Sequence, residues 1–264
     1  CIRDSINCGY NLDLPMKFSR TVRENLRDPG YRTLFDGTEL DPNSQSAEAW
    51  NTTMGGGFTA AGVGGGITGK GATVLIIDDP IKNQEEADSI ATRDSLWDWY
   101  WSTAYSRLAP GGGVLLIQTW WHDDDLAGRL QQKMRHDDEA DQFTIIRYPA
   151  LAEQWEYRNE ETHLIDRFDE PLDPKHYELI IEERLNDNPD PIRVSPTHLL
   201  LRKPDDALHP ARYNAKMMRS MRANQPARIW SALYQQNPVP DEGVFFKQEY
   251  FKFEPTAPEP YGRN

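Results

Sequence analysis

Cysteine, positive charge and long hydrophobic runs are all scarce in this chain of 264 residues, and each scarcity excludes a class of protein. The only cysteines are Cys1 and Cys8, which excludes a disulfide-stapled scaffold and makes a reducing compartment the default. No run approaches the roughly 18 apolar residues of a membrane-spanning helix, so we expect no membrane contact. Lys and Arg number 29 against 42 Asp and Glu, a net charge of −13, and this balance argues against an autonomous DNA-binding module.

What is present fits a globular protein. The length predicts one to two domains, and 38% apolar with 27% charged residues is typical of a soluble chain with long loops. The sequence opens on Cys1 and has no signal-peptide pattern. We therefore expect it to be a fragment of a longer protein.

Helical and strand patterns alternate along the first half. Continuous β-branched and aliphatic runs predict buried strands at 74–77 and 114–119, and a weaker run predicts another at 143–148. Apolar spacing predicts helices over 12–28, 83–108, 126–134, 213–221 and 230–234. The succession of strand, helix, strand and helix predicts a right-handed parallel α/β layer.

Two stretches have no such pattern. Residues 49–69 are rich in Gly, Thr and Ala, which predicts a hairpin followed by a glycine-rich loop. Residues 153–204 are acidic, polar and interrupted by proline, which predicts an insertion or linker with at most one short helix, near 176–186. The chain is therefore expected to divide into residues 1–152, 153–204 and 205–264.

A pair of carboxylates, Asp78 and Asp79, ends the strand at 74–77. Ligands of parallel sheets bind at this carboxyl edge, and in nucleotide hydrolysis one carboxylate holds Mg²⁺ while its neighbour orients the attacking water. The same pair, followed by Pro80, also fits a plain polar turn. The tripeptide alone leaves both interpretations open.

Thr119 ends the neighbouring strand and could sense a γ-phosphate or the attacking water. His122 and the carboxylates 123–125 follow, directly before a predicted helix. N-capping and compensation of the helix dipole explain these carboxylates better than a metal cluster does.

The segment Gly64–Lys70 matches the phosphate-loop pattern G-x-x-x-x-G-K, but Gly71 stands where Ser or Thr is needed. Lys70 also leads into a strand and not into a helix, so we reject a Walker A motif. The loop is either flexible with a solvated Lys70, or a finger that reaches a neighbour's phosphates. The aromatic cluster 97–101 has the helical spacing of core packing rather than of base stacking.

Three segments in this order resemble the large terminase subunit of tailed bacteriophages: GVGGGITGKGA at 62–72, LIIDDPIKN at 75–83 and QTWWHDDDLAGRL at 118–130. Flanking stretches are also similar to that family: FSRTVR at 18–23, YRTLF at 31–35, WSALYQQNP at 230–238 and GVFFK at 243–247. The resemblance covers roughly four-fifths of the chain and leaves 153–204 poorly matched.

The resemblance implies specific roles. Asp78 and Asp79 correspond to a Walker B pair, with Asp78 on Mg²⁺ and Asp79 as the catalytic carboxylate that acts on ATP. Thr119 falls where the family couples hydrolysis to movement, and Lys70 lies where some members place a basic residue that acts on the adjacent subunit's nucleotide. The implied fold is a P-loop NTPase-like parallel sheet flanked by helices, without its first strand and Walker A loop.

On this interpretation 1–152 is a partial ATPase core, 153–204 an insertion and 205–264 a helical subdomain that leads toward an absent nuclease domain. The implied partners are double-stranded phage DNA, the portal protein of the prohead, the small terminase subunit and further copies in a ring. The implied location is the host cytoplasm, with transient docking on the prohead. The fragment alone is expected to hydrolyse ATP poorly.

Two other classes of function remain. The strand-end carboxylates could form a two-metal nuclease centre, with Asp78, Asp79 and either Asp123 or Asp124 as ligands. The chain could also be a non-catalytic remnant of a packaging protein.

Overall fold

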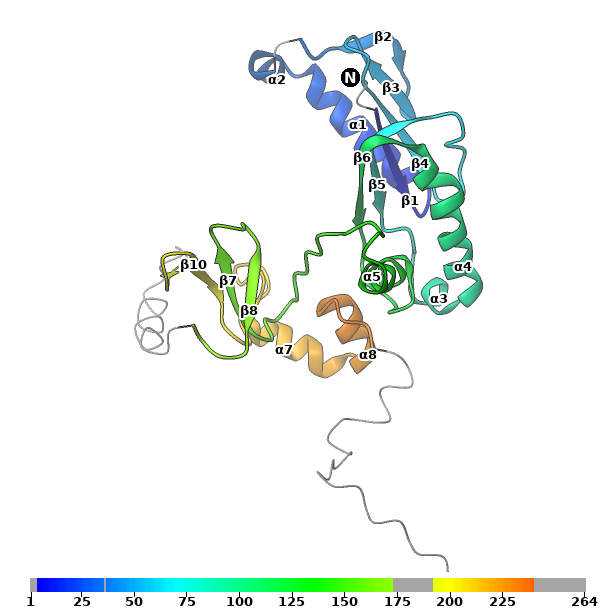
Figure 1. The fold of residues 1–264 in the computed structure, drawn as a ribbon. Coiled ribbons are helices and arrows are strands. Elements are labelled where there is room, and N and C mark those ends of the chain that lie inside the picture. The colour runs from blue at the N-terminus through cyan, green and yellow to red at the C-terminus, as the bar shows by residue number, and fades with distance from the viewer. Residues whose placement is uncertain (1–3, 36, 173–191, 240–264) are drawn as a thin grey trace, which may run out of the picture. The chain divides into compact units, whose positions relative to one another are not determined.

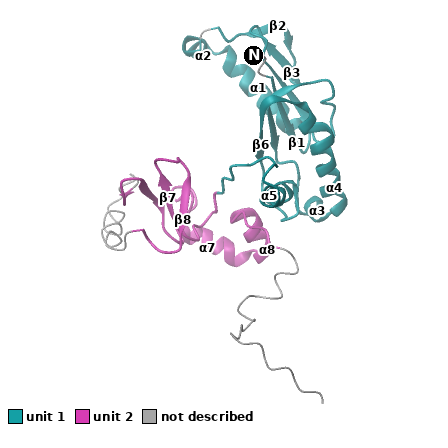
Figure 2. Cartoon of the chain, viewed as in Figure 1, with its two compact units in different colours: residues 1–147 teal, residues 148–264 magenta. Residues whose placement is uncertain are grey.

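The computed structural model of the chain describes residues 4–35, 37–172 and 192–239. It divides into two compact units, Cys1–Arg147 and Tyr148–Asn264 (Figure 2). None of the described helices has the length and apolar character needed to cross a lipid bilayer.

Unit 1 is built on a six-stranded sheet with the strand order β2-β3-β4-β1-β5-β6 (Figure 1). Its strands are β1 (Asp4–Gly9), β2 (Leu40–Gln45), β3 (Ala49–Thr52), β4 (Gly57–Gly62), β5 (Ala72–Asp78) and β6 (Leu108–Ile117). Strands β4, β1, β5 and β6 are parallel, whereas β2 and β3 are added antiparallel at one side. The predicted mixed α/β fold with a mainly parallel sheet and flanking helices is confirmed.

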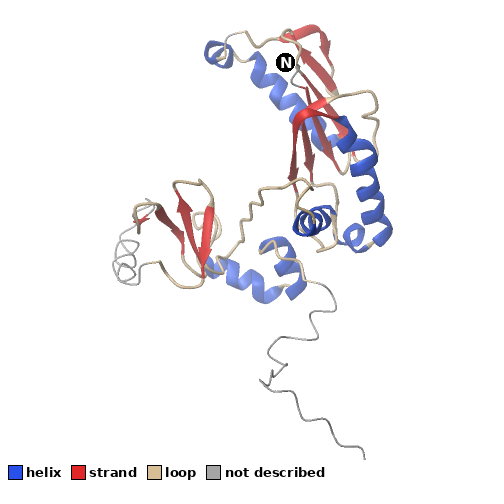
Figure 3. Ribbon diagram, viewed as in Figure 1, coloured by secondary structure: helices blue, strands red, loops and turns tan. Residues whose placement is uncertain are grey.

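One face of this sheet is the main core of unit 1. Successive strand residues point to opposite faces, and on this face Ile6, Cys8, Leu75 and Ile77 are all fully buried. Two helices, α4 (Ile90–Trp99) and α5 (Leu126–His136), cover them with the buried side chains of Leu96, Trp99, Leu126 and Leu130. The sheet and the helices that flank it are seen in Figure 3.

The opposite face is covered over only part of its width by described residues. Helix α1 (Asp13–Arg27) packs over β3 and β4, where the Trp50 indole donates to Ser19 Oγ at 3.0 Å and stacks on Phe58 with ring centroids 5.5 Å apart. Over β5 and β6, the side chains of Val74 and Leu115 are 41% and 50% exposed. Here the sheet keeps an apolar strip in contact with solvent.

The predicted helix over 83–108 is divided by its own caps. Asn83 caps α3 (Gln84–Asp88) by accepting from the Glu86 N–H at 3.0 Å, and Ser89 starts α4 by accepting from the Thr92 N–H at 3.3 Å. Ser and Asn compete with the helix backbone in this way, which favours a new start over a continuous helix. Beyond Trp99 the chain continues as a π-helical turn, Tyr100–Ala104, and a 3₁₀ turn, Tyr105–Arg107.

Other predictions along unit 1 need correction. The run 143–148 forms no strand, and β6 begins at Leu108, before the Pro110–Gly113 segment that was expected to lie outside it. A register shift between the pairs Ala72 with Leu108 and Val74 with Gly113 absorbs that segment. An edge strand tolerates proline and glycine because only one side of it must pair.

The chain also continues in a helical turn where Pro29–Gly30 was expected to end the helical region. Asp28 caps a further short helix, α2 (Pro29–Leu34), with its carboxylate on the Gly30 and Tyr31 N–H groups. Proline suits the first helical position, where its missing N–H has no partner to lose.

Unit 2 holds a second, antiparallel sheet, where the sequence indicated a polar insertion. Its strands follow the order β8-β7-β10-β9 and are β7 (Trp155–Asn159), β8 (Ile165–Phe168), β9 (Ile192–Arg193) and β10 (His198–Arg202). Glu156 is buried between Arg167 and Arg202 at 2.9 and 2.7 Å, so this small core includes a paired charge. The expected short helix at 176–186 lies outside the described residues.

Helical elements follow the antiparallel sheet of unit 2 between residues 215 and 234. They are α7 (Ala215–Asn224), α8 (Ala227–Ile229) and a π-helical turn, Trp230–Tyr234. Met218 and Trp230 are buried against Leu151, which precedes the antiparallel sheet. The predicted helices at 213–221 and 230–234 correspond to α7 and to that π-helical turn.

Candidate functional site

The carboxylate pair lies at the carboxyl edge of the parallel sheet, as the strand pattern predicted. Asp78 is the last residue of β5 and pairs with Gly9 of β1 on one side and Ile117 of β6 on the other. Three parallel strands therefore end in register around it. This is the edge at which open α/β sheets bind ligands.

Asp79 is held in an unusual backbone conformation by both neighbouring strands. Its N–H donates to the Ile117 carbonyl at 2.9 Å, and its carbonyl accepts from the Tyr10 N–H at 3.2 Å. Its φ is +44°, in the left-handed region that aspartate tolerates better than most residues, and Pro80 restricts the conformation further. Such strained residues concentrate at functional sites, where the surrounding structure maintains them.

The structure brings Asp79 and Thr119 together. The Thr119 N–H donates to Asp79 Oδ1 at 2.9 Å, across 40 residues of sequence. This bond orients the carboxylate. The two residues were predicted from separate strand ends, and their hydrogen bond joins those ends.

Asp78 carries an electrostatic cost that a cation would relieve. Burial raises the pKa of its carboxyl group above the usual value, and the charge of Asp79 raises it further. Carboxylate oxygens are preferred Mg²⁺ ligands, and Mg²⁺ commonly takes one or two carboxylates together with phosphate oxygens and water. The donor chemistry of Asp78 and Asp79 therefore fits a nucleotide-bound Mg²⁺.

Lys70 does not lie beside these carboxylates. It precedes β5, whereas Asp78 ends it, so roughly 20 Å of strand separates the two. The glycine-rich loop runs from the carboxyl end of β4 to the start of β5 and is anchored by the fully buried Ile67. The loop enters a strand without an intervening helix, which confirms the argument against a Walker A motif. Any action of Lys70 on a nucleotide would have to be on a different site from the one in its own chain.

The acidic run after Thr119 has structural partners. Asp125 caps α5 by accepting from the Gly128 N–H at 3.1 Å, which confirms the predicted cap. Asp124 bridges the buried Arg93, at 3.1 Å, and Arg129, at 2.8 Å, and these hydrogen bonds, chiefly that from Arg129, lower the pKa of Asp124. Asp123 lies 2.9 Å from His122 Nδ1.

Within the described residues, no three His, Cys, Asp or Glu side chains converge to hold a metal ion. The two-metal nuclease centre would need Asp123 or Asp124 beside Asp78 and Asp79, and Asp124 is committed to two arginines. No observed geometry favours that alternative.

A polar contact beside the site was missed in the sequence. Gln118 Nε2 donates to Asp125 Oδ2 at 2.8 Å, so the residue before Thr119 is tied to the helix cap. Asp125 has no solvent exposure, and burial raises the pKa of its carboxyl group to about 7. Gln118 and Asp125 are seven residues apart, on opposite sides of a strand end and a turn. No continuous helix or strand runs between them, so no periodic sequence pattern could predict the bond.

The aromatic cluster is part of the core, as its helical spacing predicted. Trp99 and Tyr100 are buried, and Trp97 meets Trp101 edge to face with ring centroids 5.5 Å apart. All four belong to the cluster that packs on the sheet. They are not a base-stacking surface.

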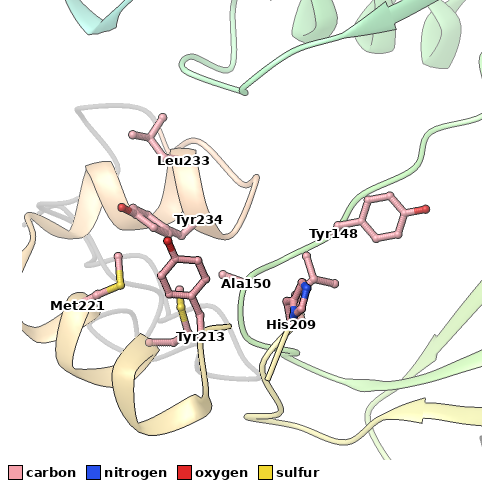
Figure 4. Close-up of a pocket in the computed structure, with 9 residues that line it drawn as sticks. Tyr148, Ala150, His209, Tyr213, Met221, Leu233 and Tyr234 are labelled. Carbon is pink, nitrogen blue, oxygen red and sulfur yellow. The ribbon is translucent and has the colours of Figure 1, made fainter. Parts of the chain in front are cut away.

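Unit 2 has an apolar pocket of about 350 Å³ that the sequence analysis did not predict (Figure 4). Its lining residues come from the segment after the unit boundary, from the segment between β10 and α7, from α7 and from the last helical turn: Tyr148, Ala150, Leu208, His209, Tyr213, Met218, Met221, Leu233 and Tyr234. The spacing of Tyr213, Met217 and Met221 predicted the helix but not the cavity beside it.

The comparisons with known proteins agree with the resemblance seen in the sequence. The family model described as "Terminase large subunit, T4likevirus-type, N-terminal" matches residues 10–253, which cover most of both units and include Asp78, Asp79 and Thr119. A comparison with curated proteins gave no match. The chain belongs to the family of T4-like terminase large subunits and matches the N-terminal part of those proteins.

Proposed function

We propose that this chain is part of an ATP-driven motor that packages phage genomic DNA into the prohead. The observation that carries the proposal is the hydrogen bond from the Thr119 N–H to Asp79 Oδ1, at the carboxyl edge where Asp78 also ends its strand. A carboxylate on a strained backbone, oriented by one hydrogen bond and next to a second carboxylate, fits the positioning chemistry of phosphoryl transfer. Family membership supports the same function.

In this proposal Asp78 holds the nucleotide's Mg²⁺, which would neutralise phosphate charge. Asp79 orients the attacking water through its carboxylate, which the Thr119 N–H holds in place by its bond to Oδ1. Thr119 responds to the state of the site through the same bond. Lys70 is proposed to act only on the nucleotide of an adjacent subunit, since it lies at the far end of β5 from Asp78.

The proposed sheet type is that of P-loop NTPases, with the phosphate-binding loop supplied by sequence outside residues 1–264. The proposed partners are double-stranded phage DNA, the portal protein, the small terminase subunit and further copies of the chain in a ring. Nuclease activity is assigned to a separate part of the same protein. The proposed site of action is the host cytoplasm, at the prohead.

The test is Mg²⁺-dependent ATP hydrolysis by the full-length protein and its Asp79→Asn variant. Asparagine tolerates a positive φ and can still accept from the Thr119 N–H, so the fold should persist while the charge is lost. We expect kcat to fall about 10²- to 10⁴-fold, the usual contribution of a positioned acid or base. Asp98→Asn, the same change on the exposed surface of α4, is the matched control and should leave kcat unchanged.

A natively folded Asp79→Asn protein with full activity would contradict the assignment. Metal-dependent DNA cleavage without nucleotide, abolished by the same substitution, would instead favour the nuclease alternative.

A further inference from the structure

The residue after Thr119 has a contact that the proposed chemistry does not use. The Arg147 guanidinium lies over the Trp120 ring, 4.5 Å from its centroid, well inside the roughly 6 Å range of cation–π contacts. Trp120 Nε1 is buried and has no hydrogen-bond partner. Hydrogen bonding of the indole therefore does not fix the ring, and the guanidinium is the polar group that rests on it.

Arg147 is itself positioned by helix α5. Its Nη2 donates to Gln131 Oε1 at 3.1 Å, and Gln131 is a buried residue of α5. The guanidinium is thus held between this helix and the residue that follows Thr119. A movement of residues 119–120 would therefore change the position of the Arg147 guanidinium directly, without a change in the rest of the sheet.

Arg147 is also the last residue of unit 1. The next residue, Tyr148, donates its N–H to Gln236 Oε1 at 2.8 Å, and the Ala150 N–H donates to the Tyr234 carbonyl at 2.7 Å. The backbone immediately after Arg147 is therefore bonded to the end of the helical part of unit 2. The contacts of Arg147 with Trp120 and Gln131 lie within unit 1, and the hydrogen bonds of Tyr148 and Ala150 lie within unit 2. The Arg147–Tyr148 peptide bond connects these two sets of contacts.

We propose that the Trp120–Arg147 contact transmits the nucleotide state of the Asp79–Thr119 site to unit 2. Arg147 is a positioning residue in this role, because it would act through its contact with Trp120 and not on the reacting atoms. A cation–π contact is weak compared with a buried hydrogen-bonded ion pair, which suits a connection that must break and re-form in each catalytic cycle. The inference rests on the proposed ATPase function and adds the route by which that site acts on the second unit.

The test is hydrogen–deuterium exchange of the full-length protein with and without Mg²⁺ and the non-hydrolysable analogue adenylyl imidodiphosphate. In the wild type we expect nucleotide to change exchange in peptides that contain Thr119 and in peptides that contain Tyr148–Leu151. In Arg147→Gln the change at Thr119 should remain, while that at 148–151 should fall at least threefold. A merely structural role would not separate the two responses.

A second pair of variants keeps the test decisive if Arg147→Gln folds poorly. Trp120→Phe retains an aromatic face for the guanidinium and should preserve the response at 148–151, whereas Trp120→Leu should reduce it as Arg147→Gln does. Equal responses at 148–151 in Trp120→Phe and Trp120→Leu would overturn the inference while leaving the ATPase proposal intact. The absence of any nucleotide response at Thr119 in the wild type would overturn both.

Discussion

Asp125→Asn probes the most deeply buried carboxyl group near the site. Asp125 has no solvent exposure, and its pKa is raised by burial to about 7, even though hydrogen bonds from Gly128, His122, Gln118 and Ala127 act in the opposite direction. A rise from the ordinary value of 3.8 to about 7 is worth about 4 kcal/mol, since each pKa unit corresponds to about 1.4 kcal/mol.

The direction of the pH dependence of stability follows from which of the two states, folded or unfolded, binds the proton of Asp125 more tightly. Below about pH 4 the carboxyl group is protonated in both the folded and the unfolded chain, and the stability linked to it is fully present. As the pH rises toward 7, the unfolded chain releases the proton while the folded chain keeps it, so the free energy of unfolding falls by up to about 4 kcal/mol. Above pH 7 no further loss from this group is expected.

Asparagine removes this titration and keeps the cap. Asn is as good an N-cap as Asp, and the Gln118 amide can turn so that its Oε1, which is buried and unpartnered, accepts from the new amide. The free energy of unfolding of the variant, measured relative to the wild type, should therefore increase by up to about 4 kcal/mol between pH 4 and pH 8.

The assay is urea denaturation at a series of pH values, followed by tryptophan fluorescence. Asp28→Asn is the matched control, because it makes the same change at the helix cap of α2, which is in contact with solvent. A difference between wild type and Asp125→Asn that stays constant from pH 4 to pH 8, or that grows in favour of the wild type, would refute the reasoning.

Three further substitutions test the packing around the site. Leu75→Ala removes a fully buried side chain of β5 and should lower the free energy of unfolding by about 2–5 kcal/mol. Val74, on the opposite face of the same strand, is 41% exposed, so Val74→Ala should lower it far less. Equal losses of the two variants in denaturant titrations would contradict the assignment of the two faces. Asp124→Asn leaves Arg93, which is 6% exposed, without its carboxylate and should cost about 2–4 kcal/mol. Because the pKa of Asp124 is lowered in the folded state, this loss should shrink as the pH falls through that lowered pKa, and thermal melts that show the same loss at acidic and neutral pH would contradict it.

Much of the site could be predicted because strand ends carry a strong local signal. The abrupt change from Leu75–Ile77 to Asp78 and Asp79 marks a buried strand and its carboxyl edge, and the same change marks Thr119. The cap at Asp125 was also predictable, since capping depends on residues three positions apart.

Strand β1 shows where local signals fail. Half of its six residues, Asp4, Asn7 and Gly9, are of types that are depleted in strands. Only Ile6 and Cys8 face the core, and they are fully buried because β4 and β5 lie on either side. Pairing on both edges, which the local sequence does not reveal, outweighs the poor intrinsic preference.

The strand ends at or near Asp78 and Thr119, the cap at Asp125 and the family resemblance could all be read from the sequence, because they depend on neighbours a few positions away. The tertiary structure decided that Asp79 and Thr119 share a hydrogen bond, that Lys70 lies at the opposite end of β5 from Asp78, and that Arg147 stacks on Trp120. Those relations depend on strand order and register, which contacts between distant parts of the chain establish together.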